Sequence, residues 1–146
     1  MSNRIKVMKL HPNAILPTYG SAEAAGADLY ACIDAPVEIQ PGECGWIPTG
    51  IALEVPKGCA GLIYARSGMA AKRNLAPANK VGVIDSDYRG EIKIVLLNHG
   101  KTVQVIEPCE RVAQFVITPV LTPAYFEVES LSGTERGTGG FGSTGK

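Results

Sequence analysis

The sequence has no long apolar run. No stretch approaches the roughly 20 consecutive apolar residues that a membrane-spanning helix needs. The first ten residues, MSNRIKVMKL, also lack the apolar centre of a secretory signal. We therefore expect a cytoplasmic protein without a membrane partner.

The chain also lacks net charge, because 14 Lys and Arg residues balance 14 Asp and Glu residues. A neutral chain has no overall field to attract nucleic acid, so we expect no nucleic-acid partner and only local binding of any polyanion. Hydrophobic residues make up 45% of the 146 residues and charged residues 19%, which is typical of a soluble globular protein. This length fits one compact domain with a substantial core.

Cysteine and histidine are too few and too widely spaced for a zinc site or a disulfide framework. The residues concerned are Cys32, Cys44, Cys59, Cys109, His11 and His99. Without an export signal, the cysteines are expected to be reduced, partly buried small hydrophobes.

The chain contains no internal repeat, no alternation of strands with helices, and no GxxxxGK[ST] phosphate-binding pattern. These absences argue against a doubly wound nucleotide-binding fold. Turn residues instead interrupt short apolar segments about every 8–12 positions, which is typical of strands. The predicted strands are Ile5–Leu10, Ala27–Cys32, Val37–Gln40, Gly45–Pro48, Ile51–Val55, Gly61–Ala65, Glu91–Asn98, Thr102–Ile106, Arg111–Thr118 and Ala124–Val128. We expect an all-β sandwich or jelly roll.

A single short helix is predicted over Ser67–Asn74 (SGMAAKRN), with Ser67 as its N-cap. Ser67 follows Arg66 and precedes Gly68, so a hydroxyl, a guanidinium and free N–H groups come together there. That combination suits an anion. A capped helix beside a solvated arginine is the simpler interpretation of this tripeptide alone.

Charged side chains cluster in the stretch GVIDSDYRGE, residues 82–91. Asp85 directly follows the apolar pair Val83 and Ile84, and glycines flank the cluster where backbones can approach closely. A carboxylate at this place could orient and deprotonate a water molecule, and Tyr88 offers a flat face for a sugar. A solvated hairpin turn remains the alternative interpretation.

Two further polar residues fall within predicted strands. Asp28 lies at the start of one, where it could form a turn or hold the water shell of a magnesium ion. Gln114 has apolar neighbours and needs partners, either core groups or a ligand.

The last fifteen residues, SGTERGTGGFGSTGK, are rich in glycine and contain one large apolar residue, Phe141. Such a segment cannot form a core of its own, so a disordered tail is one expectation. The other is a phosphate- and base-binding segment, because N–H groups, hydroxyls and Arg136 suit phosphate oxygens and Phe141 suits a base.

Taken in order, five stretches closely resemble the motifs of the trimeric dUTP pyrophosphatases, the dUTPases. They are AGADLYA from Ala25, ARSGMA from Ala65, NKVGVIDSDYRGE from Asn79, ERVAQF from Glu110 and RGTGGFGSTG from Arg136. The departures are mild: Ala65 replaces the usual Pro, Met69 the usual Leu, and Glu110 the usual Asp.

The resemblance implies a β jelly-roll homotrimer with an exchanged C-terminal arm and with active sites at subunit interfaces. It implies hydrolysis of dUTP to dUMP and pyrophosphate with Mg²⁺, which keeps uracil out of DNA and supplies dUMP for thymidylate synthesis. Residues 1–131 would form the jelly-roll domain. Residues 132–146 would form a flexible lid that completes the active site.

The resemblance also implies roles for individual residues. Asp85 would activate the water that attacks the α-phosphorus, Tyr88 would pack on the deoxyribose, and Asp28 would lie near the metal's water shell. The remaining substrate-binding residues are expected to be Asn79, Gly82, Val83, Ile84 and Lys93 around uracil, Arg66, Ser67, Gly68 and Gln114 on the phosphate chain, and Arg136, Phe141, Gly142, Ser143 and Thr144 in the lid.

Three other interpretations remain. A related trimeric deaminase would act on dCTP, but its chemistry needs a Glu over C4 of cytosine where this chain has Asp85 and Tyr88. A non-catalytic trimer that binds a nucleotide or protein would not need Asp85 or the tail. A purely structural jelly roll would leave the Phe141 segment without a purpose.

Overall fold

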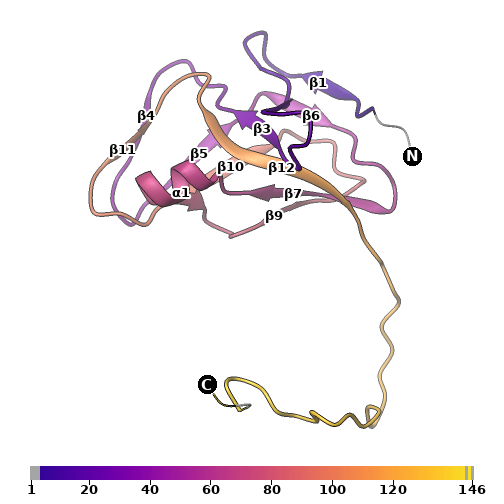
Figure 1. Ribbon diagram of the computed structural model, residues 1–146. Coiled ribbons are helices and arrows are strands. Elements are labelled where there is room, and N and C mark those ends of the chain that lie inside the picture. Colours follow the sequence, from indigo (N-terminus) through magenta and orange to yellow (C-terminus); the bar gives the residue numbers. More distant parts are fainter. Residues whose placement is uncertain (1–3, 144, 146) are drawn as a thin grey trace.

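The computed structural model describes residues 4–143 and 145 and is mostly β, with one short helix (Figure 1). The elements in chain order are β1 (Val7–Lys9), β2 (Thr18–Tyr19), β3 (Ala27–Tyr30), β4 (Val37–Ile39), β5 (Cys44–Pro48), β6 (Ile51–Leu53), β7 (Cys59–Tyr64), α1 (Ser67–Arg73), β8 (Leu75–Pro77), β9 (Gly82–Ile84), β10 (Lys93–Asn98), β11 (Gln104–Ile106) and β12 (Arg111–Pro119). The predicted all-β class with one short helix is confirmed.

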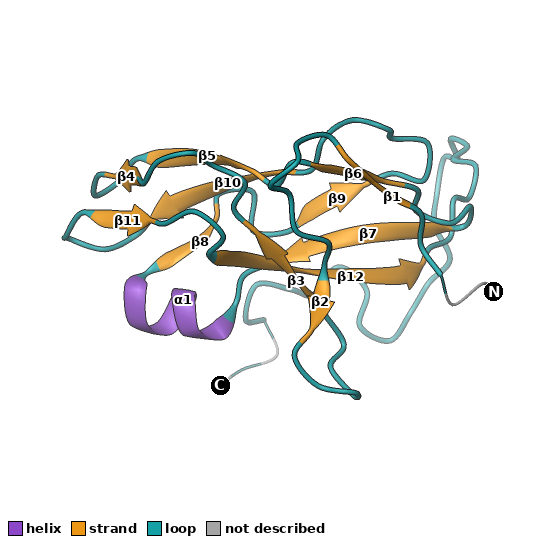
Figure 2. Cartoon of the chain, turned by 90° about the horizontal axis from the view of Figure 1, so that it is seen from above, coloured by secondary structure: helices purple, strands orange, loops and turns teal. Residues whose placement is uncertain are grey.

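A five-stranded antiparallel sheet in the order β2-β3-β12-β7-β9 forms one side of the domain. The other strands form a three-stranded sheet, β5-β10-β8, and the pairs β1-β6 and β11-β4 (Figure 2). Buried side chains from both larger sheets, including Leu29, Phe115, Ile47 and Leu96, belong to one apolar cluster. The sheets therefore enclose a common core, as in a β sandwich.

Strand β10 shows how residue alternation forms this core. Ile94 and Leu96 are buried, whereas Val95 and Leu97 are only half-buried on the other face. The strand ends at Asn98, which is also fully buried. Its amide donates to the carbonyls of Ile39 and Thr102 at 2.9 and 2.8 Å, and its oxygen accepts from the N–H of Gly100 at 2.9 Å. These bonds make a polar side chain tolerable in the core.

The largest error of the strand prediction lies in the C-terminal part of the chain. Residues 124–128 form no strand, and Tyr125 and Phe126 are 95% and 84% exposed. The alternation of apolar residues is present, but no strand in the described part of the chain pairs with the segment, and a strand needs a partner for its backbone groups. The short strands β2, β8 and β9 were not predicted, because two or three residues show no measurable alternation.

The N-cap of helix α1 lies one residue earlier than predicted. Arg66 is the N-cap residue in extended conformation and no side chain caps the helix, so Ser67 is the first helical residue rather than the cap. The helix ends at Arg73, and its C-cap residue Asn74 has a left-handed φ of 53°, a common way to terminate a helix. Met69 is its only buried residue. The helix is far too short to cross a bilayer, and no described helix meets the length and hydropathy that a span requires.

The four cysteines are free, but they are not equally buried. Cys59 is buried and Cys32 half-buried, whereas Cys44 and Cys109 are exposed, so the expectation of partial burial is wrong for the last two. Burial, followed by the nearby carboxylates of Glu91 and Asp34, raises the pKa of the Cys32 thiol. A raised pKa keeps this thiol protonated and unreactive near neutral pH.

Replacing Asn98 with Ala is expected to lower the free energy of unfolding by about 3 kcal/mol, because buried backbone groups lose their partners. Urea unfolding at a fixed protein concentration measures the effect. His99→Ala, at the exposed next position, is the control and should change stability by less than about 0.5 kcal/mol. Equal stability of Asn98→Ala and the unmodified chain would contradict the role assigned to Asn98.

Candidate active site

The chain between β8 and β10 folds back as a hairpin that carries most of the predicted base-reading residues. Its middle strand, β9, extends the five-stranded sheet by pairing with β7. A cavity of about 100 Å³ lies within the hairpin, and its lining includes Asn79, Gly82, Val83, Ile84 and Lys93. Pockets for whole drug-sized ligands have roughly 300–1,000 Å³. This cavity is therefore of a size for a single ring rather than for a nucleotide.

Tyr88 is folded back onto the hairpin. Its hydroxyl donates to the carbonyl of Glu91 at 2.9 Å. A Cβ atom at Gly90 would lie 2.4 Å from that hydroxyl oxygen, so the tyrosine ring occupies the space that any other side chain at position 90 would need. Glycine at position 90 therefore permits this orientation of Tyr88.

Asp85 lies at the tight turn that follows β9. The N–H of Tyr88 donates to the Asp85 carbonyl at 3.1 Å, which closes the turn. The side chain of Asp85 is exposed and has no hydrogen-bond or ion-pair partner within the described part of the chain. Its carboxylate is consequently available to a water molecule or a ligand.

Glu91, a further acidic residue of the hairpin, makes structural contacts. One of its oxygens accepts from the N–H of Gly50 at 2.9 Å, and the other lies 3.7 Å from the Lys93 amine. These contacts fasten the returning arm of the hairpin to the turn between β5 and β6. Asp85 and Asp87, unlike Glu91, are thus free of side-chain partners among the described residues, and of the two Asp85 directly follows β9, whose residues line the hairpin cavity.

A second group of predicted site residues lies on adjacent strands of the five-stranded sheet. Gln114 on β12 is paired with Asp28 on β3 and with Tyr64 at the end of β7. The Gln114 amide donates to the Ala65 carbonyl at 2.8 Å. A Cβ atom at Gly26 would lie 2.5 Å from the Gln114 amide oxygen, so this glycine leaves room for the glutamine.

The carboxylate of Asp28 is held between two guanidinium groups. Arg66 Nε lies 2.8 Å from Asp28 Oδ1, and Arg111 Nη1 lies 3.3 Å from Asp28 Oδ2. The Asp28 side chain is only 14% exposed, so solvent screens these pairs less than it would at an open surface. Arg111 was not among the predicted site residues, although it belongs to the stretch ERVAQF. Its position in the sequence does not show that it contacts Asp28 on β3.

The two groups of side chains lie toward opposite ends of strand β7. Ile84, which precedes Asp85, is paired with Gly61, whereas Arg66 follows the other end of the strand. At about 3.3 Å per residue along a strand, the five residues from Gly61 to Arg66 span roughly 16 Å. Within one chain, Asp85 and Arg66 therefore do not face the same small space.

The C-terminal segment leaves the β domain after β12 and runs clear of it (Figure 1). Arg136 donates to the Gly139 carbonyl at 2.7 Å, and Phe141 and Ser143 are exposed. The structure therefore does not bring Arg136, Phe141, Gly142 or Ser143 near the other predicted site residues. Thr144 lies outside the described residues.

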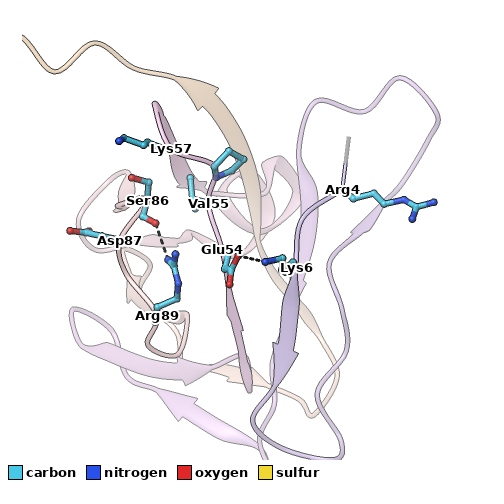
Figure 3. A pocket seen from close by; sticks show the side chains of 9 residues that line it. Arg4, Lys6, Glu54, Val55, Lys57, Ser86, Asp87 and Arg89 are labelled. Atoms are coloured by element: carbon cyan, nitrogen blue, oxygen red, sulfur yellow. Dashed lines mark hydrogen bonds and ion pairs between the residues drawn. The ribbon is translucent and has the colours of Figure 1, made fainter. Parts of the chain in front are cut away.

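A larger cavity of about 560 Å³ adjoins the turn after Asp85 (Figure 3). Its charged lining consists of Arg4, Lys6, Lys57, Arg89, Glu54 and Asp87. Lys6 lies 3.0 Å from Glu54, and its hydrogen bond and charge lower the pKa of that carboxyl. Arg89 donates to the carbonyls of Ser86 and Tyr88 at 2.8 and 2.9 Å. None of the predicted substrate-binding residues lines this cavity, so it is distinct from the hairpin cavity.

A metal site built from protein side chains alone is not found in the described part of the chain, where no group of three or more His, Cys, Asp or Glu residues is placed to hold an ion. Asp28 uses both oxygens to accept from arginine, and a carboxylate has about four lone-pair sites. The remaining lone pairs can accept hydrogen bonds from water. This arrangement fits indirect contact with a hydrated cation better than direct coordination.

Comparison with protein families gives a match to the dUTPase model over residues 12–145. The deoxyuridine 5'-triphosphate nucleotidohydrolase of Nautilia profundicola is 50% identical over 143 residues, which cover 98% of this chain and 99% of that protein. The enzyme of the same name from Syntrophotalea carbinolica is 48% identical over 141 residues, covering 97% and 96%. The chain belongs to the dUTPase family.

Solved structures agree with this assignment. A mutant dUTPase of Staphylococcus bacteriophage 80alpha, solved with dUpNHpp, matches with a TM-score of 0.91 and 30% identity, over 99% of this chain and 100% of that one. A mutant dUTPase of phage phi11 of S. aureus, described with a structural Mg(II) ion, matches with a TM-score of 0.81 and 26% identity, over 90% and 100%.

Proposed function

We propose that this chain hydrolyses dUTP to dUMP and pyrophosphate, and so keeps uracil out of DNA and supplies dUMP for thymidylate synthesis. The observation that carries the proposal is the exposed, unpartnered carboxylate of Asp85 beside a ring-sized hairpin cavity in a chain of the dUTPase family. Its relatives carry the name deoxyuridine 5'-triphosphate nucleotidohydrolase. We place the reaction in the cytoplasm.

The hairpin cavity would bind uracil. The Asn79 side chain, the main chain of Val83 and Ile84, and the main chain near Lys93 would pair with the polar edge of the base, with Gly82 allowing close approach. A cavity of about 100 Å³ supports exclusion of the additional methyl group of thymine. Fixed donors and acceptors of the hairpin would reject cytosine. Cytosine presents different donors and acceptors from uracil, which would leave buried polar atoms of the cavity unpaired.

Tyr88 would pack against the deoxyribose and leave no room for a 2′-hydroxyl. The hydrogen bond from its hydroxyl to Glu91 and its close fit over Gly90 support this role, since both limit movement of the ring. A fixed aromatic wall discriminates by shape, without a specific polar contact.

Asp85 would accept a proton from the attacking water. The resulting hydroxide attacks the α-phosphorus, the bond to the bridging oxygen breaks, and pyrophosphate leaves. General-base catalysis of this kind contributes about 10²–10⁴-fold in rate. The absence of a competing partner for Asp85 among the described residues supports this role.

The second group of residues would bind the phosphate chain. Arg66 donates from Nε to Asp28 and from one terminal nitrogen to the Arg111 carbonyl at 3.5 Å, which leaves its other terminal nitrogen for phosphate, and Ser67 and Gly68 are exposed beside it. Gln114 would contribute its amide. Phosphoryl transfer depends mainly on stabilising charge of this kind.

Mg²⁺ is the proposed cofactor, and when bound it would neutralise phosphate charge. Mg²⁺ usually keeps several waters and binds through substrate phosphates. Asp28 would hold some of these waters with the lone pairs that Arg66 and Arg111 leave unused.

The active site would form between chains of a homotrimer. Gly61, which pairs with Ile84 next to Asp85, is separated from Arg66 by roughly 16 Å along β7, whereas a base must be within hydrogen-bond reach of its water. Combining the hairpin of one chain with the phosphate-binding residues of another removes this separation. The exposed apolar residues Leu121, Tyr125, Phe126 and Leu131 support exchange of the C-terminal arm between chains.

The tail would then close over the site as a lid, with Phe141 on uracil and with Arg136, Gly142, Ser143 and Thr144 near the phosphates. Its position outside the β domain supports an action on another chain (Figure 1). The domain boundary at residue 131 remains a prediction; the last strand ends earlier, at Pro119.

Replacement of Asp85 by Asn is expected to lower turnover of dUTP at least about 100-fold while dUTP binding is retained, because an amide cannot accept the proton. Pyrophosphate release from dUTP, dCTP, dTTP and UTP, each with and without Mg²⁺, measures activity and selectivity. Unchanged release by Asp85→Asn would exclude Asp85 as the base. Ammonia release from dCTP would identify a deaminase, and binding without turnover of any substrate would identify a non-catalytic protein.

Mixing two inactive variants, Asp85→Asn and Arg66→Ala, is expected to restore activity after dissociation and reassembly. If each site takes Asp85 from one chain and Arg66 from another, about one quarter of the sites in random mixed trimers are intact. Pyrophosphate release before and after reassembly measures this, and sedimentation gives the oligomeric state. A mixture that stays inactive while the unmodified chain recovers would place both residues in a site within one chain.

Removal of residues 136–146 is expected to leave the oligomer intact and to lower turnover of dUTP by at least about tenfold, because an open site admits bulk water. Sedimentation and pyrophosphate release measure the two properties. Phe141→Ala tests the base contact separately. Full activity of the shortened chain would mean that the tail takes no part in the reaction.

A further inference from the structure

Helix α1 needs external support to keep its orientation. It has seven residues and one buried side chain, whereas isolated helices shorter than about 12–15 residues are marginal in water. Its first residues, Ser67 and Gly68, follow Arg66 at the phosphate-binding end. Any tilt of α1 would therefore move these residues relative to a bound substrate.

Arg73, the last residue of α1, is held by three different acceptors. Its Nε donates to Gln104 Oε1 at 2.9 Å, one terminal nitrogen donates to the Val105 carbonyl at 2.5 Å, and the other donates to Glu110 Oε1. All three guanidinium nitrogens are thus used within the chain. The planar group is fixed in position and in rotation, which a single ion pair would not achieve.

Glu110 is held equally firmly. While Oε1 accepts from Arg73, Oε2 accepts from the backbone N–H of Glu107 at 2.9 Å. The Glu110 carbonyl accepts from the N–H of Ala31 at 2.8 Å, which fastens this residue to the end of β3. The two charged side chains are 28% and 24% exposed, so the pair is partly shielded from water.

These contacts connect the two ends of the helix through β12 and β3. Glu110 is followed by Arg111, which contacts Asp28, and Asp28 contacts Arg66 at the other end of α1. The first and last turns of the helix are therefore anchored to the same short stretch at the start of β12. Movement at one end strains the contacts at the other.

We propose that Arg73 and Glu110 are positioning residues for phosphate binding: their ion pair fixes the orientation of α1, and hence of Arg66, Ser67 and Gly68. The inference rests on the proposed function. Neither side chain touches the substrate; Arg73 is occupied by its three acceptors, and both act through the helix and the strand that they join.

The test compares the binding of two ligands that differ in their phosphate chain, dUpNHpp and dUMP. In Arg73→Met the affinity for dUpNHpp is expected to fall roughly tenfold, while the affinity for dUMP changes less than about twofold. Calorimetric titration of each ligand gives both values, and thermal unfolding checks that the variant is folded. Lys72→Met, which removes the neighbouring exposed charge on the same helix, is the control and should leave both affinities unchanged.

Further variants separate positioning from general stability. Glu110→Gln is expected to reproduce the effect of Arg73→Met, and the double variant should be no worse than either, because residues acting as a unit are not additive. Arg73→Lys keeps the charge but loses the three-way contact, so it should show a partial loss and remains measurable if Arg73→Met does not fold. Glu110→Asp, shorter by one methylene, should also lose part of the dUpNHpp affinity.

Equal loss of affinity for both ligands, full additivity of the two single variants, or normal dUpNHpp binding by Arg73→Lys and Arg73→Met would overturn the inference. Failure of the proposed function looks different. In that case the unmodified chain would release no pyrophosphate from dUTP, whatever the binding of the variants.

Discussion

The placement of one carboxylate between two arginines organises the end of the five-stranded sheet that carries the proposed phosphate-binding residues. Asp28 neutralises part of the charge on Arg66 and Arg111 and fixes both side chains before any ligand arrives. Without it, two guanidinium groups would repel each other at the junction of three strands. These residues come together because β3, β12 and β7 are adjacent and antiparallel in the five-stranded sheet.

The hairpin shows a different kind of preorganisation, based on shape rather than charge. Gly90 admits the ring of Tyr88, and Glu91 fastens the returning arm to Gly50. Asp85, directly after β9, has no side-chain partner among the described residues, and neither does Asp87. Because the frame around Asp85 is rigid before a ligand binds, most conformational entropy is lost on folding and little on binding.

Composition and alternation were sufficient to predict the fold class and most long strands, because buried and less buried residues alternate along strands such as β3, β5 and β10. The resemblance of five stretches to dUTPase motifs predicted the candidate site residues, and the structure places those of the hairpin and those around Asp28 in two groups. Contacts such as Arg111 with Asp28 and Arg73 with Glu110 could not be predicted, since they depend on strand order and helix direction. The segment 124–128 has the pattern of a strand, but pattern alone does not supply a partner.

The separation of Asp85 and Arg66 along β7 has a consequence for mass action. If neither half of the site works alone, a folded single chain has no activity, and specific activity rises with total protein concentration until association is complete. Dilution would then abolish activity by dissociating the subunits without unfolding them. Catalysis would report the association equilibrium directly, and the strength of the subunit contact would set the lowest concentration at which the protein is useful.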